Sequence, residues 1–129
     1  MPTTYNKYKV GSKVKRTFRG IVFGSIWEKR VYQLLLGFID DERIGRQGTY
    51  ELMPGYTRVD GKKIRPIRYL ADFVIDDTIV IDSKGRETEA FKIKKKLFEY
   101  QYKKLIHLVS DSGNEWKNQE TLKQLVSCK

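Results

Sequence analysis

The stretch that decides the fold is YLADFVIDDTIVIDSKG, which runs from Tyr69 to Gly85. Ile, Val and Phe dominate it, as they do in the buried strands of a sheet, and the Asp76-Asp77 pair in its middle predicts a turn between two strands. Asp72 and Asp82 interrupt these apolar runs. An ionised carboxylate in an apolar strand is costly unless it is paired or bound to a metal. The two acids therefore need a chemical explanation.

The pairing of the two strands decides where these side chains point. Because side chains alternate across a strand, Asp82 and Lys84 share one face. If the hairpin turns about Asp77, Asp72 lies opposite Asp82, and Val74 lies opposite Val80. Directly opposed residues have Cβ atoms roughly 4.5–5.5 Å apart, so the two carboxylates would converge. A shift of the pairing by one residue would put them on opposite faces instead.

Two converging carboxylates repel each other unless a cation lies between them. Hard carboxylate oxygens without histidine suit Mg²⁺ or Mn²⁺, and such an ion can activate water and stabilise the charge on a phosphodiester. Lys84, on the same face, could hold a water aimed at a phosphate. The alternative is a structural ion pair of the acids with Lys84 or Arg68. The spacing of the residues leaves both interpretations open.

Glu28, early in the first long predicted helix, is the candidate for a third metal ligand. However, Ser25 and Glu28 also have the S-x-x-E spacing of a capping box, in which each side chain accepts a hydrogen bond from a main-chain N–H at the start of the helix. Capping alone accounts for these two residues without any metal. On spacing alone, both roles stay open.

Hydrophobic periodicity and turn residues predict the other elements. In chain order we expect a short strand or extended segment at 20–23, a helix at 25–40, a loop at 40–48, a strand at 49–53, a hairpin turn at Asp60-Gly61, strands at 64–75 and 78–84, a helix at 88–102, a strand at 104–110 and a short helix at 119–126. On the second long helix we expect an apolar stripe formed by Ala90, Ile93, Leu97 and Tyr100, widened by Phe91 and Phe98. A helix, three antiparallel strands, a helix and a strand predict an α/β fold with a mixed central sheet flanked by helices.

Composition limits the class of protein. The chain has 129 residues, 40% of them hydrophobic and 33% charged, which predicts a single soluble domain. No run approaches the roughly 20 apolar residues of a membrane span, and the N-terminus has no apolar segment typical of a secretory signal. Cys128 is the only cysteine and His107 the only histidine. A disulfide framework and a histidine-rich metal centre are therefore excluded, and a reducing cytoplasm is expected.

The net charge of +10 predicts a polyanionic partner, most often nucleic acid. No acid precedes Glu28, whereas cations crowd the first twenty residues. We expect a basic arm at 1–17 and a single domain at 18–129. The candidate DNA-binding cations of this N-terminal region are Lys13, Lys15, Arg16 and Arg19. Such an arm can neutralise phosphates; the alternative is a solvated, disordered tail.

At this point the residues match a known pattern. A helix glutamate, a strand aspartate and D-x-K on the next strand, here Glu28, Asp72 and Asp82-Ser83-Lys84, resemble the PD-(D/E)XK nuclease superfamily. The predicted αβββαβ order is also that of its restriction-endonuclease-like core. The text YLADFVIDDTIVIDSKGRETEAFKIKKKLFEY is similar to small phage-encoded nucleases described as Holliday-junction-resolvase-like, and FGSIWEKRVYQLL resembles the opening helix of bacteriophage endonuclease I. The resemblance covers roughly residues 18–110; it departs at Ala71, where the superfamily's name has proline.

The resemblance implies metal-dependent cleavage of DNA that leaves 5′-phosphate and 3′-hydroxyl ends. Asp72 and Asp82 would hold Mg²⁺ or Mn²⁺. Glu28 would be the third carboxylate, directly or through water, and Lys84 would position the attacking water. It also implies a phage-encoded enzyme in the cytoplasm of a bacterial host.

The substrate expected from the resemblance is branched DNA. A junction resolvase cuts two strands nearly symmetrically, so a homodimer is expected. Lys94 and Lys96, next to such a site, could contact a phosphate of the cleaved strand; the alternative is a solvated lysine face. The competing functions are a nickase or restriction-like nuclease of the same fold, and a DNA-binding protein on a nuclease scaffold that has lost its activity.

Overall fold

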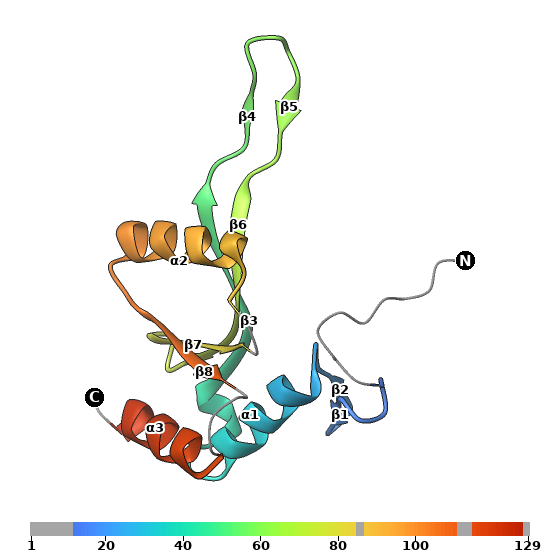
Figure 1. Ribbon diagram of the computed structural model, residues 1–129, viewed down its shortest axis with the longest axis vertical. Helices are drawn as coiled ribbons and strands as arrows, with labels where there is room; N and C mark the ends of the chain where they lie inside the picture. The colour runs from blue at the N-terminus through green and yellow to red at the C-terminus, as the bar shows by residue number, and fades with distance from the viewer. Residues whose placement is uncertain (1–11, 85–86, 111–114, 128–129) are drawn as a thin grey trace. The chain divides into compact units, whose positions relative to one another are not determined.

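The structure is a computed structural model that describes residues 12–84, 87–110 and 115–127. Within these ranges the chain forms three α-helices, a mixed four-stranded sheet and two pairs of two-residue strands (Figure 1). It divides into two compact units. Unit 1 consists of Met1–Asp41, Ser83–Arg86 and Leu108–Lys129, and unit 2 consists of Glu42–Asp82 and Glu87–His107. The predicted boundary between an arm at 1–17 and a domain at 18–129 stays a prediction.

Unit 1 is built on two helices. The strands β1 (Thr17–Phe18) and β2 (Ile21–Val22) pair antiparallel ahead of α1 (Ile26–Leu36), and α3 (Glu115–Ser127) contacts α1. The helix α1 ends four residues before the predicted end, because the N–H of Gly37 donates to the carbonyls of the last turn and the chain then leaves the helix. The helix α3 begins before the predicted residue 119. The buried side chains include Phe23, Val31, Leu35, Leu122 and Val126.

The central sheet has the strand order β3-β6-β7-β8, in which β3 pairs antiparallel with β6 and β6 pairs antiparallel with β7. The strands are β3 (Ile44–Met53), β6 (Ile67–Ile75), β7 (Ile79–Lys84) and β8 (Ile106–Ser110), with the helix α2 (Glu89–Tyr102) between the last two in sequence. The predicted αβββαβ order is confirmed. Alternate residues of β6 are fully or almost fully buried, in keeping with a strand of the core: Tyr69, Ala71, Phe73 and Ile75.

The predicted loop at 40–48 is wrong. A 3-10 turn occupies Asp41–Arg43, and β3 begins directly after it at Ile44. Glycines suggested a loop, but here they allow two strands to approach closely. A Cβ on Gly48 would lie 2.7 Å from Cγ2 of Val74, and one on Gly45 would lie 3.2 Å from the Val74 carbonyl oxygen. The glycines are thus explained by close packing of β3 on β6.

The helix α2 buries only the two phenylalanines by which the predicted apolar stripe was widened. Its buried residues are Phe91 and Phe98, and α2 contacts β3 and β6 (Figure 1). In contrast, Ile93, Leu97 and Tyr100 of the predicted stripe are 60%, 37% and 78% exposed. The two phenylalanines lie seven residues apart on one face and bury their large rings against aromatic side chains of the sheet, which outweighs the narrower aliphatic stripe. Thr88 caps the helix by accepting from the N–H of Phe91 at 3.1 Å.

A hairpin joins β3 to β6. It contains β4 (Tyr56–Thr57) and β5 (Lys63–Ile64), which pair antiparallel. The predicted turn at Asp60-Gly61 is confirmed: Gly61 has a φ of 92°, and its N–H donates to the Arg58 carbonyl at 2.9 Å. The predicted single strand at 64–75 is interrupted between β5 and β6 at Pro66, which has no N–H to donate. None of the described helices is long and apolar enough to cross a membrane.

Candidate functional site

The turn between β6 and β7 sets the pairing of the two strands that carry the acids. Asp76 and Asp77 have φ angles of 52° and 60°, and the N–H of Thr78 donates to the Ile75 carbonyl at 3.0 Å. Two left-handed residues in succession are typical of a type I′ turn, whose twist matches that of a hairpin. The turn predicted from the Asp76-Asp77 pair is thus confirmed. Ile75 pairs with Ile79 rather than with Thr78, so the strands pair about Asp77.

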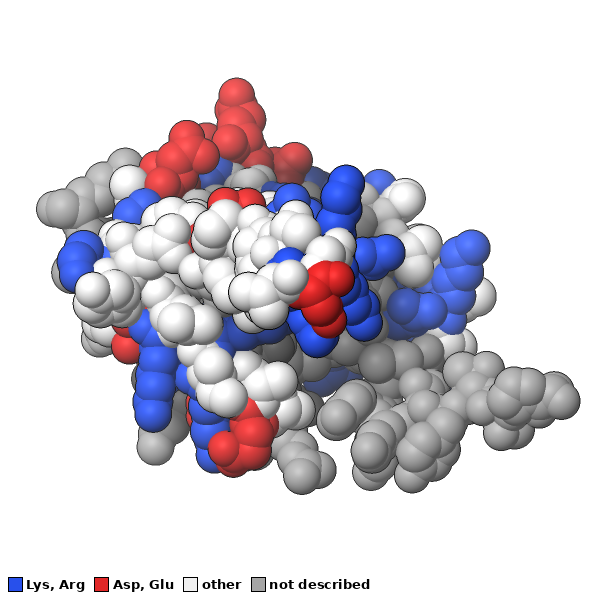
Figure 2. All heavy atoms as spheres, turned by 90° about the horizontal axis from the view of Figure 1, so that it is seen from above, with Lys and Arg blue, Asp and Glu red and all other residues white. Residues whose placement is uncertain are grey.

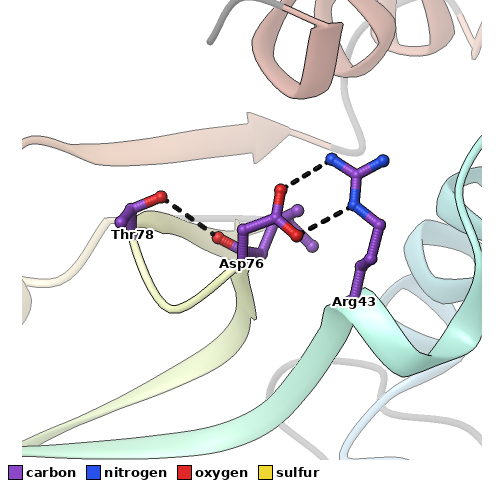
Figure 3. Close-up of polar contacts among 4 residues, drawn as sticks. Arg43, Asp76 and Thr78 are labelled. Carbon is purple, nitrogen blue, oxygen red and sulfur yellow. Dashed lines mark hydrogen bonds and ion pairs between the residues drawn. The ribbon is translucent and has the colours of Figure 1, made fainter.

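Arg43 fastens this turn to the start of β3 (Figure 3). Its Nε and Nη2 donate to the two carboxylate oxygens of Asp76 at 2.8 and 2.6 Å, and its main-chain carbonyl accepts from the N–H of Asp76 at 3.0 Å. The fork-shaped pairing limits the carboxylate to one orientation. Asp76 is therefore a structural residue of the turn, although it lies close in sequence to the candidate acids.

The register brings Asp72 and Asp82 next to each other. Ile79, Val80 and Ile81 of β7 lie opposite Ile75, Val74 and Phe73 of β6, respectively. The predicted pairing of Val74 with Val80 is confirmed. Asp72 and Asp82 come next on the two strands, and Oδ1 of Asp82 accepts from the N–H of Asp72 at 3.4 Å. A side-chain oxygen thus occupies the position in which a main-chain carbonyl would continue the ladder.

The two acids differ in burial. Asp82 is 1% exposed and follows the fully buried Ile81, whereas Asp72 is half-buried. Burial of a carboxylate opposes its ionisation unless hydrogen bonds or a nearby cation favour the charged form. Asp82 is therefore fixed within the sheet, whereas the carboxylate of Asp72 can contact a ligand that arrives from solvent.

Tyr69 belongs to the same group. Its ring packs against Phe91 and Phe98, with centroids 6.2 and 5.6 Å away. Burial, followed by the negative charges of Asp82 and Asp72, raises the pKa of its hydroxyl far above the ordinary value for tyrosine. The hydroxyl therefore stays protonated and remains a hydrogen-bond donor close to the two carboxylates. Its place as an aromatic core residue hid this role in the sequence.

Gln47 lies across from Asp72 on the other neighbouring strand. Arg46 pairs with Phe73 and Gly48 pairs with Ala71, so Gln47 occupies the position between them. Its φ is 56°, in the left-handed region that residues other than glycine rarely adopt. Such conformations are frequent at functional sites. The sequence offered no signal for Gln47, because this stretch was interpreted as a loop.

Glu28 lies in unit 1, at the start of α1. The Ser25 hydroxyl accepts from the N–H of Glu28 at 3.0 Å, and Oε1 of Glu28 accepts from the N–H of Gly24 at 3.2 Å. This is the reciprocal capping expected from S-x-x-E, shifted by one residue from the usual Ser25 N–H. Glu28 is 6% exposed. The capping role is confirmed, and the role as a third metal ligand stays a prediction.

Lys84 is the last residue of β7, and its side chain lies outside the described part of the chain. Within the described residues, no group of three or more His, Cys, Asp or Glu side chains is arranged to hold a metal ion. The acids that the structure brings together are therefore Asp72 and Asp82. The water-positioning role of Lys84 stays a prediction.

The candidate DNA-binding cations lie at several places. In unit 1, Lys13, Lys15 and Arg19 are exposed, whereas Nη1 of Arg16 donates to the Phe23 carbonyl at 2.9 Å. Arg16 is therefore also a structural residue that holds the β1–β2 hairpin. On α2 in unit 2, Lys96 is exposed and Lys94 is half-buried. Their contacts with DNA stay predictions.

These observations define a mixed α/β protein, compatible with an α/β nuclease-like core, in which two aspartates meet between neighbouring strands. Residues 5–124 match the model of the family described as "Protein of unknown function (DUF1064)", and the chain belongs to this family. No curated protein and no solved structure matches the chain. The family description names no activity, so the function proposed below rests on the residues themselves.

Proposed function

We propose that this protein is a metal-dependent DNA endonuclease whose ion is held by Asp72 and Asp82. One observation carries the proposal: the carboxylate of Asp82, 1% exposed within an apolar strand, accepts a hydrogen bond from the main chain of a second aspartate. Two acids so close together are unfavourable in a core without a compensating partner. A divalent cation accounts for both positions at once.

The donor set fits Mg²⁺ or Mn²⁺. Carboxylate oxygens are hard ligands, and Mg²⁺ often uses one or two carboxylates and keeps several waters. Asp72 and Asp82 would hold the ion, which when bound supplies a Lewis acid for the scissile phosphate and lowers the pKa of water. Among the chain's own groups, the main-chain N–H of Asp72 orients Asp82, and the protonated hydroxyl of Tyr69 lies near the two carboxylates. Glu28 and Lys84 keep their proposed roles as third ligand and as the residue that positions water.

The charge of the chain supports DNA as the substrate. A net charge of +10 favours binding to a phosphate backbone through the release of counterions. The preference for branched DNA, the homodimer, and the setting of a phage enzyme in a bacterial cytoplasm rest on the sequence resemblance.

A second candidate is a DNA-binding protein on the same scaffold without catalysis. One observation favours it: the described residues contain no cluster of three metal-ligating side chains. The two functions differ in their response to metal. A nuclease requires Mg²⁺ or Mn²⁺ to act, whereas a binding protein would hold DNA intact with any cation.

The test is cleavage of labelled four-way junction, linear duplex and single strand in Mg²⁺, Mn²⁺ or Ca²⁺. We expect cleavage in Mg²⁺ or Mn²⁺ and its loss in Asp82→Asn, which keeps an oxygen to accept from Asp72. The matched control is Asp77→Asn: Asp77 is exposed, and asparagine tolerates its left-handed φ. Intact DNA with every metal, or wild-type cleavage by Asp82→Asn, would refute the proposal. Preference for the junction would separate a resolvase from a nickase or restriction-like enzyme.

A further inference from the structure

The β4–β5 hairpin carries a concentration of positive charge that the sequence-based site did not include. Residues 54–68 contain five cations and one acid. All five cations are exposed: Arg58, Lys62, Lys63, Arg65 and Arg68. The acid, Asp60, is engaged within the turn, since its carboxylate accepts from Nη2 of Arg58 at 2.8 Å and from the N–H of Lys62 at 3.2 Å. The charge left to meet a partner is therefore strongly positive.

The hairpin contributes little to a core. Every residue from 54 to 63 is exposed, including Tyr56 at 52% and Val59 at 109%. In Figure 1 the hairpin projects past the end of the β3–β6 pair. Figure 2 views the molecule from above, and Lys and Arg side chains stand on several sides of the white spheres at its centre. A fully exposed valine at the tip of a cationic ribbon has no packing role within the described chain, and a partner that offers both phosphates and an apolar surface suits both features.

We propose that the β4–β5 hairpin is a two-stranded ribbon that enters the major groove of a duplex DNA arm; this inference rests on the proposed function. The major groove, about 12 Å wide, admits a two-stranded β-ribbon. Lys62, Lys63 and Arg65 bind the flanking phosphates, and Val59 makes an apolar contact in the groove. Contacts between cations and phosphates do not depend on the base sequence, so they suit an enzyme that recognises the shape of DNA.

The length of the strands sets the distance of this contact from the acids. Lys63 and Asp72 lie on one continuous run of chain, about nine residues apart, which spans at most about 30 Å at roughly 3.3 Å per residue. One base pair of duplex occupies about 3.4 Å, so the hairpin meets the arm about nine base pairs from the scissile position. This is an upper limit, but most of the run is in the extended strands β5 and β6, so we expect the contact toward the far end of this span, beyond an arm of about 6 base pairs.

The test compares Lys62→Gln/Lys63→Gln/Arg65→Gln with the unchanged hairpin, both in the Asp82→Asn background and in Ca²⁺, so that binding is measured without cleavage. Dissociation constants for junctions with arms of about 6 and about 16 base pairs are measured over a range of salt. The loss of three phosphate contacts lowers the slope of log K against log salt by about 2.7. We expect at least a tenfold loss of affinity for the long arms and little change for the short ones.

The matched control removes the same charge elsewhere: Arg30→Gln/Lys92→Gln/Lys123→Gln, three exposed cations outside the hairpin. Equal losses in both variants, or equal losses for short and long arms, would overturn the proposal, as would failure of the unchanged protein to bind DNA. Hairpin-dependent binding without cleavage by the wild type in Mg²⁺ or Mn²⁺ would support the hairpin and refute the nuclease. If the hairpin substitutions leave the cleavage of long-armed junctions unchanged, the nuclease is supported and the role of the hairpin is refuted.

Discussion

Replacing Gly48 with alanine tests whether β3 packs on β6 as described. The new Cβ would lie 2.7 Å from Cγ2 of Val74, against an ordinary carbon contact of about 3.5–4.0 Å. Val74 is stiff at χ1 because it is β-branched, and it is 8% exposed, so it cannot swing aside into solvent. Overpacking of this kind costs about 1–3 kcal/mol of the free energy of unfolding.

A second substitution makes the cause identifiable. Val74→Ala removes the clashing methyl group and alone costs about 2 kcal/mol through lost burial. If the overlap is real, Gly48→Ala/Val74→Ala is more stable than the sum of the two single losses by about 1 kcal/mol or more. Urea unfolding followed by circular dichroism measures all three variants. Val74 and Asp72 share a face of β6, so we also expect Gly48→Ala to slow DNA cleavage.

Two results would refute this reasoning. A Gly48→Ala protein as stable as the wild type would mean that β3 does not approach β6 closely at this position. Strictly additive losses in the double variant would mean that the cost of the alanine arises elsewhere, for example from the Tyr50 ring, whose Cε2 atom lies 3.6 Å from the same Cβ position.

Three further predictions concern the acids and the turn. Mg²⁺ at ten times its Kd raises the free energy of unfolding of the wild type by about 1.4 kcal/mol, and in thermal denaturation Asp82→Asn shows no such rise; an equal rise in both would place the ion elsewhere. Because the pKa of Tyr69 is raised in the folded state, its contribution to the free energy of unfolding is complete below about pH 10 and declines as the pH rises further. We therefore expect Tyr69→Phe to lose less stability than the wild type at alkaline pH. Identical curves of stability against pH for the two proteins would contradict this. Arg43→Gln lowers the free energy of unfolding, measured in urea, by about 0.5–1 kcal/mol, since Arg43 and Asp76 are partly exposed. Arg58→Gln lowers it by less, because the pair of Arg58 with Asp60 is more exposed. A larger loss for Arg58→Gln than for Arg43→Gln would disagree with the burial of the two pairs.

Local patterns predicted the succession of elements because their signals act over a few residues. The aspartate pair after Ile75 adopts two left-handed conformations, as a turn requires, but Ile75 pairs with Ile79 rather than with Thr78, and this extra residue is what brings Val74 opposite Val80. A shift of one residue would turn every side chain of β7 to the other face. The sequence therefore predicted the adjacency of Asp72 and Asp82 only on the condition that the hairpin turns about Asp77, and the register of the structure supplies that condition.

Patterns failed where a residue's role depends on a neighbour far away in sequence. Gly45 and Gly48 suggested a loop, because nothing in the sequence indicates that Val74 occupies the space a Cβ would need. Of the apolar residues predicted for one face of α2, only Phe91 and Phe98 are buried, because the aromatic rings of Tyr50 and Tyr69 provide the surface on which Phe98 packs.

The candidate site shows the same division. Asp72 and Asp82 stand out in the sequence because a charge in an apolar strand is conspicuous. Tyr69 and Gln47 do not, because an aromatic residue in a strand and a glutamine in a polar stretch are both ordinary. Their relation to the acids follows from burial of the hydroxyl and from the register of β3 on β6.

The amino-acid sequence by itself determined the order of helices and strands, the two hairpin turns and the pairing of β6 with β7, since each depends on periodicity and on the backbone preferences of adjacent residues. Tertiary structure alone decided which face of α2 is buried, why glycines stand in β3, and that the hydroxyl of Tyr69 lies near the acids. These outcomes depend on shape and charge at residues distant in the chain, and a short-range pattern contains no information about such neighbours.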